Sequence, residues 1–315
     1  MIVLIGGNGF LGRHLRRLIE QTLDGDVTIV SRRPSDIPLG PREEFLTSQA
    51  FCTDHSADVI RMASSIIYLA TASTPSVFAQ EPWRELSENA SPALFQFERI
   101  AKLNPTARIV LLSSGGTVYG NNGSSGPVEE QTFPAPISAY GLGKVAIEEA
   151  LKFVHRTRAV PISILRLSNP VGEFAQGGVQ GLIPNILNSI RTGNPLPVFG
   201  DGSHVRDYVD ADETAAAILM AAQDRVHNSV VWNVGSGIGL STSAVIAEIE
   251  RITGRPVPLT EMPARALDVQ SIVLNCSLIK CNLGWKANKS IFETISQIWS
   301  AQSEAAQCSA SDNAR

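Results

Sequence analysis

The chain has 315 residues, 43% of them hydrophobic, and a formal net charge of −4. This length suffices for one large domain or two modest ones, each with a real core. The slight excess of acidic residues and the lack of a basic run argue against nucleic acid or an anionic membrane surface as a partner.

The cysteines and histidines argue against a metal site. The four cysteines and five histidines are scattered, and no two cysteines form a C-x-x-C pair. Such thiols are typical of free cysteines in a reducing compartment. No apolar run reaches the length of a membrane span, and the first one, MIVLIGG, is too short for a signal peptide. We therefore expect a cytoplasmic protein without a metal or a membrane partner.

Short apolar runs rich in Val and Ile alternate with longer amphipathic segments through the first half of the chain. The predicted strands are residues 2–5, 27–30, 65–70, 108–113 and 162–167. The predicted helices are residues 10–23, 89–103 and 140–157. Apolar strands that alternate with helices indicate a parallel sheet covered on both faces. The fold class predicted is α/β, with a Rossmann-type doubly wound parallel sheet.

The sequence pattern changes after residue 170, where Gly and Pro become frequent in the predicted loops. A strand at 230–236 and helices near 241–253 and 290–300 follow. We expect a dinucleotide-binding domain at 1–168, to which the chain partly returns at about 206–236. A smaller α/β C-terminal lobe at 169–302 would bind substrate, and the polar residues 303–315 would form a disordered tail.

A glycine-rich turn follows the first strand and opens the first helix. Gly6, Gly9 and Gly12 give the pattern G-x-x-G-x-x-G, and Phe10 and Leu11 lie within it. Glycines allow a tight turn in which a phosphate approaches backbone N–H groups at a helix N-terminus. The pattern favours a dinucleotide site over a turn that binds nothing.

The second predicted strand ends in a basic segment. Folds that select NAD usually place an acidic residue there, to accept a hydrogen bond from the ribose 2′-OH. Ser31, Arg32 and Arg33 occupy this neighbourhood. Arginine pairs with a 2′-phosphate, so the segment favours NADP(H), and a solvated basic turn is the alternative.

Tyr140 and Lys144 lie four residues apart at the start of a strongly helical run. Positions i and i+4 share one face of a helix, so the ammonium could lower the pKa of the phenol and prepare it as a base. An ordinary surface helix is the alternative, and the spacing alone does not separate the two.

Further motifs follow in a fixed order along residues 1 to 300. They are GGNGFLGRHL, SSGGTVYG (113–120), YGLGK (140–144), LRLSNPVG (165–172), VFGDGSHVRDYVDADE (198–213) and WNVGSGIGLS (232–241). This ordered set resembles the extended short-chain dehydrogenases/reductases of the NAD-dependent epimerase/dehydratase family. Within that family it is most similar to the UDP-hexose 4-epimerase branch.

The resemblance implies roles for individual residues. Tyr140 would be the acid/base, and Lys144 would hold the nicotinamide ribose and lower the pKa of Tyr140. The cofactor would also touch Leu69, Ala70 and Thr71 after the predicted strand at 65–70. The family favours NAD where the basic segment favours NADP. It also implies a homodimer built from the helices at 89–103 and 140–157.

One position departs from the family pattern. Gly115 stands where relatives carry a Ser or Thr that binds the reacting oxygen. Thr117, just before Val118 and Tyr119, is the predicted replacement. A 4,6-dehydratase would carry Asp-Glu near Gly116 and Thr117, and the lack of both acids argues against that reaction.

The resemblance also places the substrate, a nucleotide-diphosphate sugar. Asn169 would contact phosphate or sugar, and Arg206 and Arg265 would clamp the diphosphate through charge-assisted bonds. As alternatives, Arg265 could pair with Asp268 on the surface, and Arg206 could stabilise its own loop.

Three functional hypotheses remain open from the sequence. The first is a UDP-hexose-type 4-epimerase with transient oxidation at C4. The second is an NADPH-dependent reductase of a nucleotide-linked 4-keto-sugar, which would use the same Tyr140 and Lys144. The third is a dinucleotide-binding regulator without turnover, against which the presence of both residues speaks.

Overall fold

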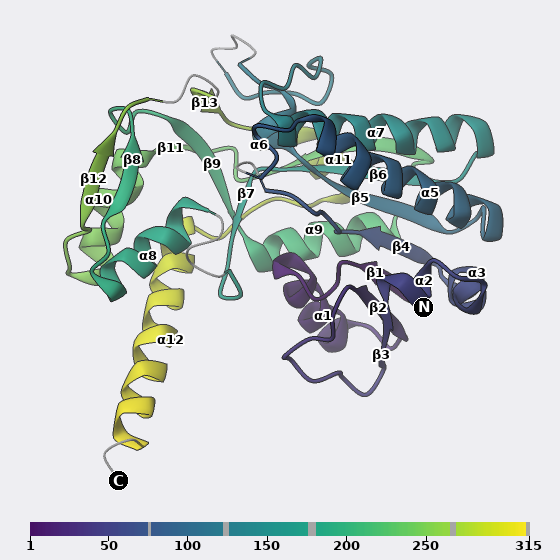
Figure 1. Ribbon diagram of the computed structural model, residues 1–315, viewed down its shortest axis with the longest axis horizontal. Helices are drawn as coiled ribbons and strands as arrows, with labels where there is room; N and C mark the ends of the chain where they lie inside the picture. The colour runs from purple at the N-terminus through teal and green to yellow at the C-terminus, as the bar shows by residue number, and fades with distance from the viewer. Residues whose placement is uncertain (75–76, 122–125, 176–180, 265–268, 313–315) are drawn as a thin grey trace.

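The computed structural model describes residues 1–74, 77–121, 126–175, 181–264 and 269–312 (Figure 1). Its largest feature is a seven-stranded sheet in the order β10-β6-β5-β4-β1-β2-β3, in which every pair is parallel. The strands are β1 (Ile2–Ile5), β2 (Val27–Ser31), β3 (Glu43–Thr47), β4 (Ser65–Tyr68), β5 (Arg108–Ser114), β6 (Ile162–Leu167) and β10 (Ser229–Val234).

Helices cover both faces of this sheet, as Figure 1 shows. One apolar core lies under α1 (Phe10–Thr22), α9 (Ala211–Gln223) and α11 (Ser277–Leu283). A second core, on the opposite face, lies under α3 (Ala57–Met62), α5 (Ser91–Leu103) and α7 (Ala139–Arg158). Because both faces are covered, the central strands read as continuous apolar runs. The predicted doubly wound α/β fold is confirmed.

The strand order reverses between β1 and β4, which are neighbours in space. In open parallel sheets, ligands bind at such a switch point, beyond the carboxyl ends of the strands. The segments that follow β1, β2, β4 and β5 therefore meet at one edge of the sheet.

A smaller lobe follows residue 168. Its four-stranded sheet contains β7 (Asn169–Val171), β9 (Val205–Asp210), β11 (Gly239–Ser241) and β13 (Ser271–Ile272). A separate pair joins β8 (Leu196–Phe199) to β12 (Leu259–Met262). A third apolar core lies between α8 (Leu182–Thr192), α10 (Thr242–Thr253) and α12 (Ile291–Asp312). Between β9 and β11 the chain returns to the large sheet through α9 and β10.

Two differences from the sequence prediction concern the rim of the large sheet and the end of the chain. The edge strand β3 was not predicted, because its residues EEFLT are mostly polar and lie at the rim of the sheet. The last helix, α12, continues to Asp312, whereas the sequence predicted its end near residue 300 and a disordered tail from residue 303. The segment contains Ala, Ser and Glu but neither Gly nor Pro, so no residue type in it breaks a helix.

The remaining short elements connect the larger ones. They are α2 (Ser48–Phe51), η1 (Asp54–Ser56), α4 (Trp83–Glu85), the π-helical turn η2 (Leu86–Ala90) and α6 (Gly115–Val118). Over the described ranges, no helix has both the length and the apolar character needed to cross a membrane. The same residues contain no group of three or more His, Cys, Asp and Glu side chains placed to hold a metal ion.

Candidate active site

The glycine turn after β1 has no room for side chains. Gly6 has a φ of +91°, and a Cβ there would lie 2.8 Å from the backbone nitrogen of Ala70. A Cβ on Gly12 would collide with the carbonyl oxygen of Gly7. Gly9 is the N-cap of α1 and provides no side-chain cap, so the N–H groups of the first turn are open to an anion. These features fit the phosphates of a dinucleotide.

The basic segment after β2 lies beside this turn. The side chain of Asn8 donates a hydrogen bond to the carbonyl oxygen of Arg33 (2.9 Å). Arg32 and Arg33 are exposed, and Ser31 is half-buried at the strand end. The nearby Asp36 is paired with Arg13, whose Nε donates to the carbonyl of Asn8. The segment therefore offers two exposed guanidiniums at the predicted cofactor edge.

The segment after β4 forms the other wall of the glycine turn. The backbone N–H of Leu69 donates to the carbonyl of Ile5 (2.8 Å), and Ala70 touches Gly6. The exposed Thr71 follows directly. The predicted cofactor residues on β1, β2 and β4 thus share one edge of the sheet.

Tyr140 and Lys144 occupy the first turns of α7. Ser138 caps this helix by accepting a hydrogen bond from the N–H of Gly141 (3.1 Å). Lys144 is 7% exposed, and its Nζ lies 5.5 Å from the centroid of the Tyr140 ring. The same Nζ donates to the carbonyl of Leu112 at the end of β5 (3.1 Å). The structure therefore brings the predicted catalytic pair to the sheet edge that carries the glycine turn.

Two helical glycines explain how α7 packs so closely. A Cβ on Gly141 would lie 2.8 Å from the carbonyl oxygen of Thr117. A Cβ on Gly143 would lie 2.6 Å from Oε2 of Glu85. Glycine inside a helix is costly, so both positions exchange helix stability for close contact with α6 and α4.

The electrostatics of the pair differ from the sequence expectation. Burial raises the pKa of the Tyr140 phenol above its usual value, and the charge of Glu85 adds to the rise. Burial lowers the pKa of Lys144 to about 8, although the charges of Glu85 and Glu148 oppose this effect. We expected Lys144 to lower the pKa of Tyr140, but burial and the charge of Glu85 raise it.

The turn α6 accounts for the missing hydroxyl at Gly115. A Cβ there would lie 2.6 Å from a methyl group of Leu274 and 3.0 Å from the carbonyl oxygen of Arg166. Thr117 is half-buried, and its hydroxyl makes one long bond of 3.5 Å to the carbonyl of Ser114. Asn169 approaches the same turn, 4.0 Å from a Cβ built on Gly116, and donates to the carbonyl of Asp207. Asn169 therefore lies beside the turn that carries Thr117.

The two predicted arginines give different results. Arg206 on β9 is half-buried and donates to the carbonyl of Val205 (2.9 Å). Arg265 lies outside the described residues, as does Asp268, its alternative partner. The structure therefore does not place a diphosphate clamp.

Sequence reasoning missed Glu85, a carboxylate beside the pair. Glu85 is 2% exposed and accepts hydrogen bonds from Ser73 (2.9 Å) and Asn89 (2.8 Å). In the sequence it looks like one of several acids in the polar run EPWRELSEN. The one sequence signal for a close neighbour of α7 is Gly143, because glycine is unfavourable inside a helix unless another element packs against it.

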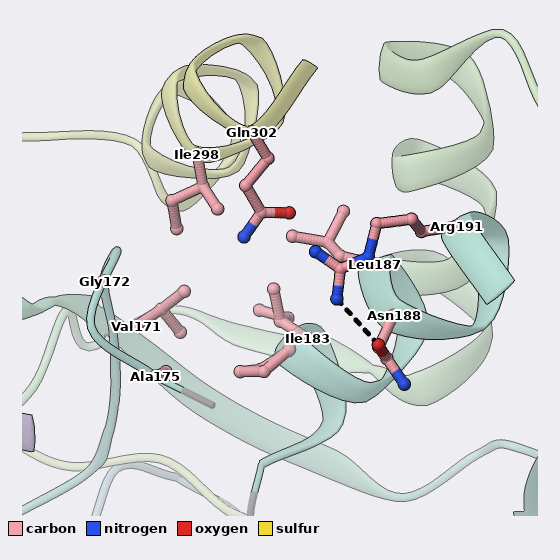
Figure 2. Close-up of a pocket in the computed structure, with 10 residues that line it drawn as sticks. Val171, Gly172, Ala175, Ile183, Leu187, Asn188, Arg191, Ile298 and Gln302 are labelled. Carbon is pink, nitrogen blue, oxygen red and sulfur yellow. Dashed lines mark hydrogen bonds between the residues drawn. The ribbon is translucent and has the colours of Figure 1, made fainter. Parts of the chain in front are cut away.

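A separate pocket of about 390 Å³ lies in the smaller lobe, between the end of β7, α8 and α12. Figure 2 shows apolar side chains that face it, with Arg191 bonded to Asn188 at one side and Gln302 at another. None of the predicted site residues lines it. The pocket is thus distinct from the Tyr140–Lys144 site.

Comparison with known proteins agrees with this geometry. Residues 2–235 match the NAD dependent epimerase/dehydratase family, which covers well over half of the chain. The protein therefore belongs to that family. The sequence is 27% identical to the dTDP-4-dehydro-6-deoxyglucose reductase of Escherichia coli, over 90% of this chain and 92% of the relative.

Two solved structures superpose along nearly the whole chain. The UDP-glucose 4-epimerase of Thermotoga maritima, solved with UDP-glucose, has a TM-score of 0.85 and 27% identity and covers 96% of this chain and 99% of its own. The UDP-glucose-4-epimerase of Stenotrophomonas maltophila, solved with NAD and formylated UDP-arabinopyranose, has a TM-score of 0.86 and 26% identity. That match covers 98% of this chain and 99% of the other.

Proposed function

We propose that the protein is a nucleotide-sugar 4-epimerase that acts on a UDP-hexose through transient oxidation at C4. The placement of Tyr140 and Lys144 carries this proposal, because Lys144 bonds Leu112 near the carboxyl end of β5, on the same side of the sheet as the glycine turn after β1. The two similar epimerase structures, one with UDP-glucose and one with NAD, support it.

The residues present divide the chemistry between them. A bound nicotinamide dinucleotide supplies the hydride acceptor and donor at C4. Tyr140 takes the proton of the C4 hydroxyl and later returns it. Lys144, with a pKa of about 8, is largely charged at neutral pH, so it can hold the ribose and oppose the raised pKa of the phenol. Thr117 serves as the hydrogen-bond partner of the reacting oxygen in place of Gly115.

The substrate end completes the proposal. Asn169 contacts the sugar or phosphate from beside α6, and Arg206 and Arg265 bind the diphosphate. The protein acts in the cytoplasm as a homodimer. Exposed apolar side chains on the packed helices α5 and α7, such as Phe95 and Phe153, support a dimer contact on this face.

The direct test is conversion of UDP-glucose. Purified protein with NAD and UDP-glucose should form UDP-galactose until the two reach equilibrium, without net NADH formation. The Tyr140→Phe variant should retain its fold and lose this conversion. If neither UDP-glucose nor UDP-galactose is converted, UDP-N-acetylglucosamine and UDP-glucuronate are the next substrates. No turnover of any of them would refute the proposal.

The second candidate is an NADPH-dependent reductase of a nucleotide-linked 4-keto-sugar. The exposed Arg32 and Arg33 at the end of β2 favour it, and so does the similarity to the Escherichia coli reductase. Mass analysis of any dinucleotide released on denaturation separates the two. Near-stoichiometric NAD favours the epimerase. An empty protein that prefers NADPH over NADH favours the reductase.

A further inference from the structure

Glu85 is a buried carboxylate only half of which is hydrogen-bonded. It ends α4, where the chain enters the π-helical turn η2. Its Oε2 accepts both hydrogen bonds, from the hydroxyl of Ser73 and the amide of Asn89. Its Oε1 is shielded from solvent and has no hydrogen-bond partner among the described residues. A buried oxygen without a hydrogen-bond partner destabilises the fold, because it loses its bonds to water and gains none in return.

The carboxylate lies between the two sides of the site. On one side it packs against Gly143, which directly precedes Lys144 on α7. On the other it binds Ser73, while the side-chain oxygen of Asn89 accepts from the N–H of Ala72 (2.7 Å). Glu85 therefore joins the catalytic helix to the segment after β4.

These hydrogen bonds do not require a negative charge. The carbonyl oxygen of a glutamine could accept from both Ser73 and Asn89. A glutamine would also avoid burying a charge, which is costly without a paired cation. Among the described residues Glu85 forms no ion pair. The charge itself must therefore act on a neighbour if it has a role.

The charges of two carboxylates, Glu85 and Glu148, act on Lys144, and within the described ranges only Glu148 has a cationic partner. Glu148, one turn further along α7, forms a bidentate pair with Arg166 of β6 (2.7 Å) and lies 3.8 Å from Lys152. Tyr119, after α6, bonds the same Arg166. Arg84, next to Glu85 in sequence, pairs instead with Glu81 and Glu88.

We propose that Glu85 is a positioning residue for the Tyr140–Lys144 pair. Its charge keeps Lys144 protonated inside a buried site, and its hydrogen bonds hold residues 71–73 against α7. The inference rests on the proposed function, since it takes Tyr140 and Lys144 to be the catalytic pair. It assigns no new step to Glu85, which acts only through Lys144 and the segment after β4.

The test measures the pKa of Lys144 without any substrate. Lysine labelled with ¹³C at Cε reports the titration by NMR, and the Lys144→Arg variant identifies its signal. The Lys144 pKa should be near 8 in the wild type and fall by roughly one unit in Glu85→Gln. At neutral pH the charged fraction would then drop from about nine tenths to about half. Glu85→Asp, which keeps the charge on a shorter arm, should give an intermediate value.

Ser73→Ala is the matched control, because it removes a hydrogen bond to the same carboxylate and leaves the charge. Its Lys144 pKa should match the wild type. An unchanged pKa in folded Glu85→Gln overturns the proposal, as does an equal fall in Ser73→Ala. If Glu85→Gln does not fold, Glu85→Met supplies the neutral variant. If that also fails, an unmoved value in Glu85→Asp overturns it. Failure to convert UDP-glucose would count against the proposed function and leave this titration intact.

Discussion

The Tyr140–Lys144 site at the carboxyl ends of the large sheet and the pocket of the smaller lobe differ in how closely their walls are packed. Around Tyr140 and Lys144, backbones approach so closely that glycines at 141 and 143 are required. In the smaller lobe, the pocket between α8 and α12 is lined mainly by apolar side chains, and Arg191 bonds a residue of its own helix. Close packing of backbones suits a proton transfer that is sensitive to distance, whereas the pocket of the smaller lobe offers an apolar wall and few polar groups.

The largest expected effect is the loss of turnover when Tyr140 is changed. Tyr140→Phe should lower kcat by about 10²- to 10⁴-fold, the range for loss of a general acid or base. The fold should survive, because phenylalanine keeps the ring of Tyr140 and its contact with Lys144. Conversion of UDP-glucose measures the loss, and circular dichroism checks the fold. Activity within tenfold of wild type would remove Tyr140 from the chemistry.

The tight packing itself can be tested at Gly143. A Cβ at this position meets Oε2 of Glu85, so Gly143→Ala should destabilise the protein by about 1–3 kcal/mol. Helix propensity alone would give the opposite sign, a gain of up to about 1 kcal/mol. Urea denaturation measures the change. The control is Glu149→Ala on the exposed face of α7, which should stay within about 0.5 kcal/mol of wild type. A stabilised Gly143→Ala protein would show that α4 does not press on α7.

The burial of Lys144 predicts a pH dependence of stability. Its pKa is about 8 in the fold against an ordinary value of 10.5, so between these pH values the unfolded chain binds more protons. Unfolding free energy should therefore rise with pH across this window, and Lys144→Met should lack that rise. At neutral pH the Met variant should be more stable by about 1–3 kcal/mol. Thermal or urea unfolding at several pH values tests this. A parallel pH dependence in both proteins would contradict a buried ammonium.

The same contrast explains what the sequence could predict. The strands of the large sheet are continuous apolar runs such as IVLI and SIIY, and their positions follow from composition alone. The edge strand EEFLT lacks that signal, and the short strands of the smaller lobe pair with segments far away in sequence.

At the site, the glycine motif and the basic segment predicted the residues after β1 and β2, and the family resemblance implied those after β4 and at the start of α7. It did not predict Glu85, because its role depends on α4 meeting Gly143 across more than 50 residues of chain. The raised pKa of Tyr140 was missed for the same reason, since it is caused by burial and by Glu85, a carboxylate far away in sequence.

A smaller effect is expected at the cofactor rim. Arg32→Ala with Arg33→Ala should reduce the preference for NADPH over NADH by roughly tenfold, because exposed charge contacts are worth about 1 kcal/mol or less each. Fluorescence titration with each dinucleotide measures the ratio. Arg42→Ala is the control. Arg42 pairs with Asp24 and lies just before β3, at the amino ends of the strands and therefore away from the cofactor site at their carboxyl ends. An unchanged ratio in the double variant would leave these arginines as surface residues and favour NAD.

The smallest effect is expected in the pocket of the smaller lobe. Arg191 is exposed and bonds Asn188 one turn earlier on α8, a contact worth a few tenths of a kcal/mol. Arg191→Ala should change stability by less than about 0.5 kcal/mol and turnover of UDP-glucose by less than about twofold. Urea denaturation and steady-state kinetics measure both. A large rise in KM with an unchanged kcat would show that the pocket contributes to substrate binding. The functional separation between the closely packed Tyr140–Lys144 site and the pocket of the smaller lobe would then fail.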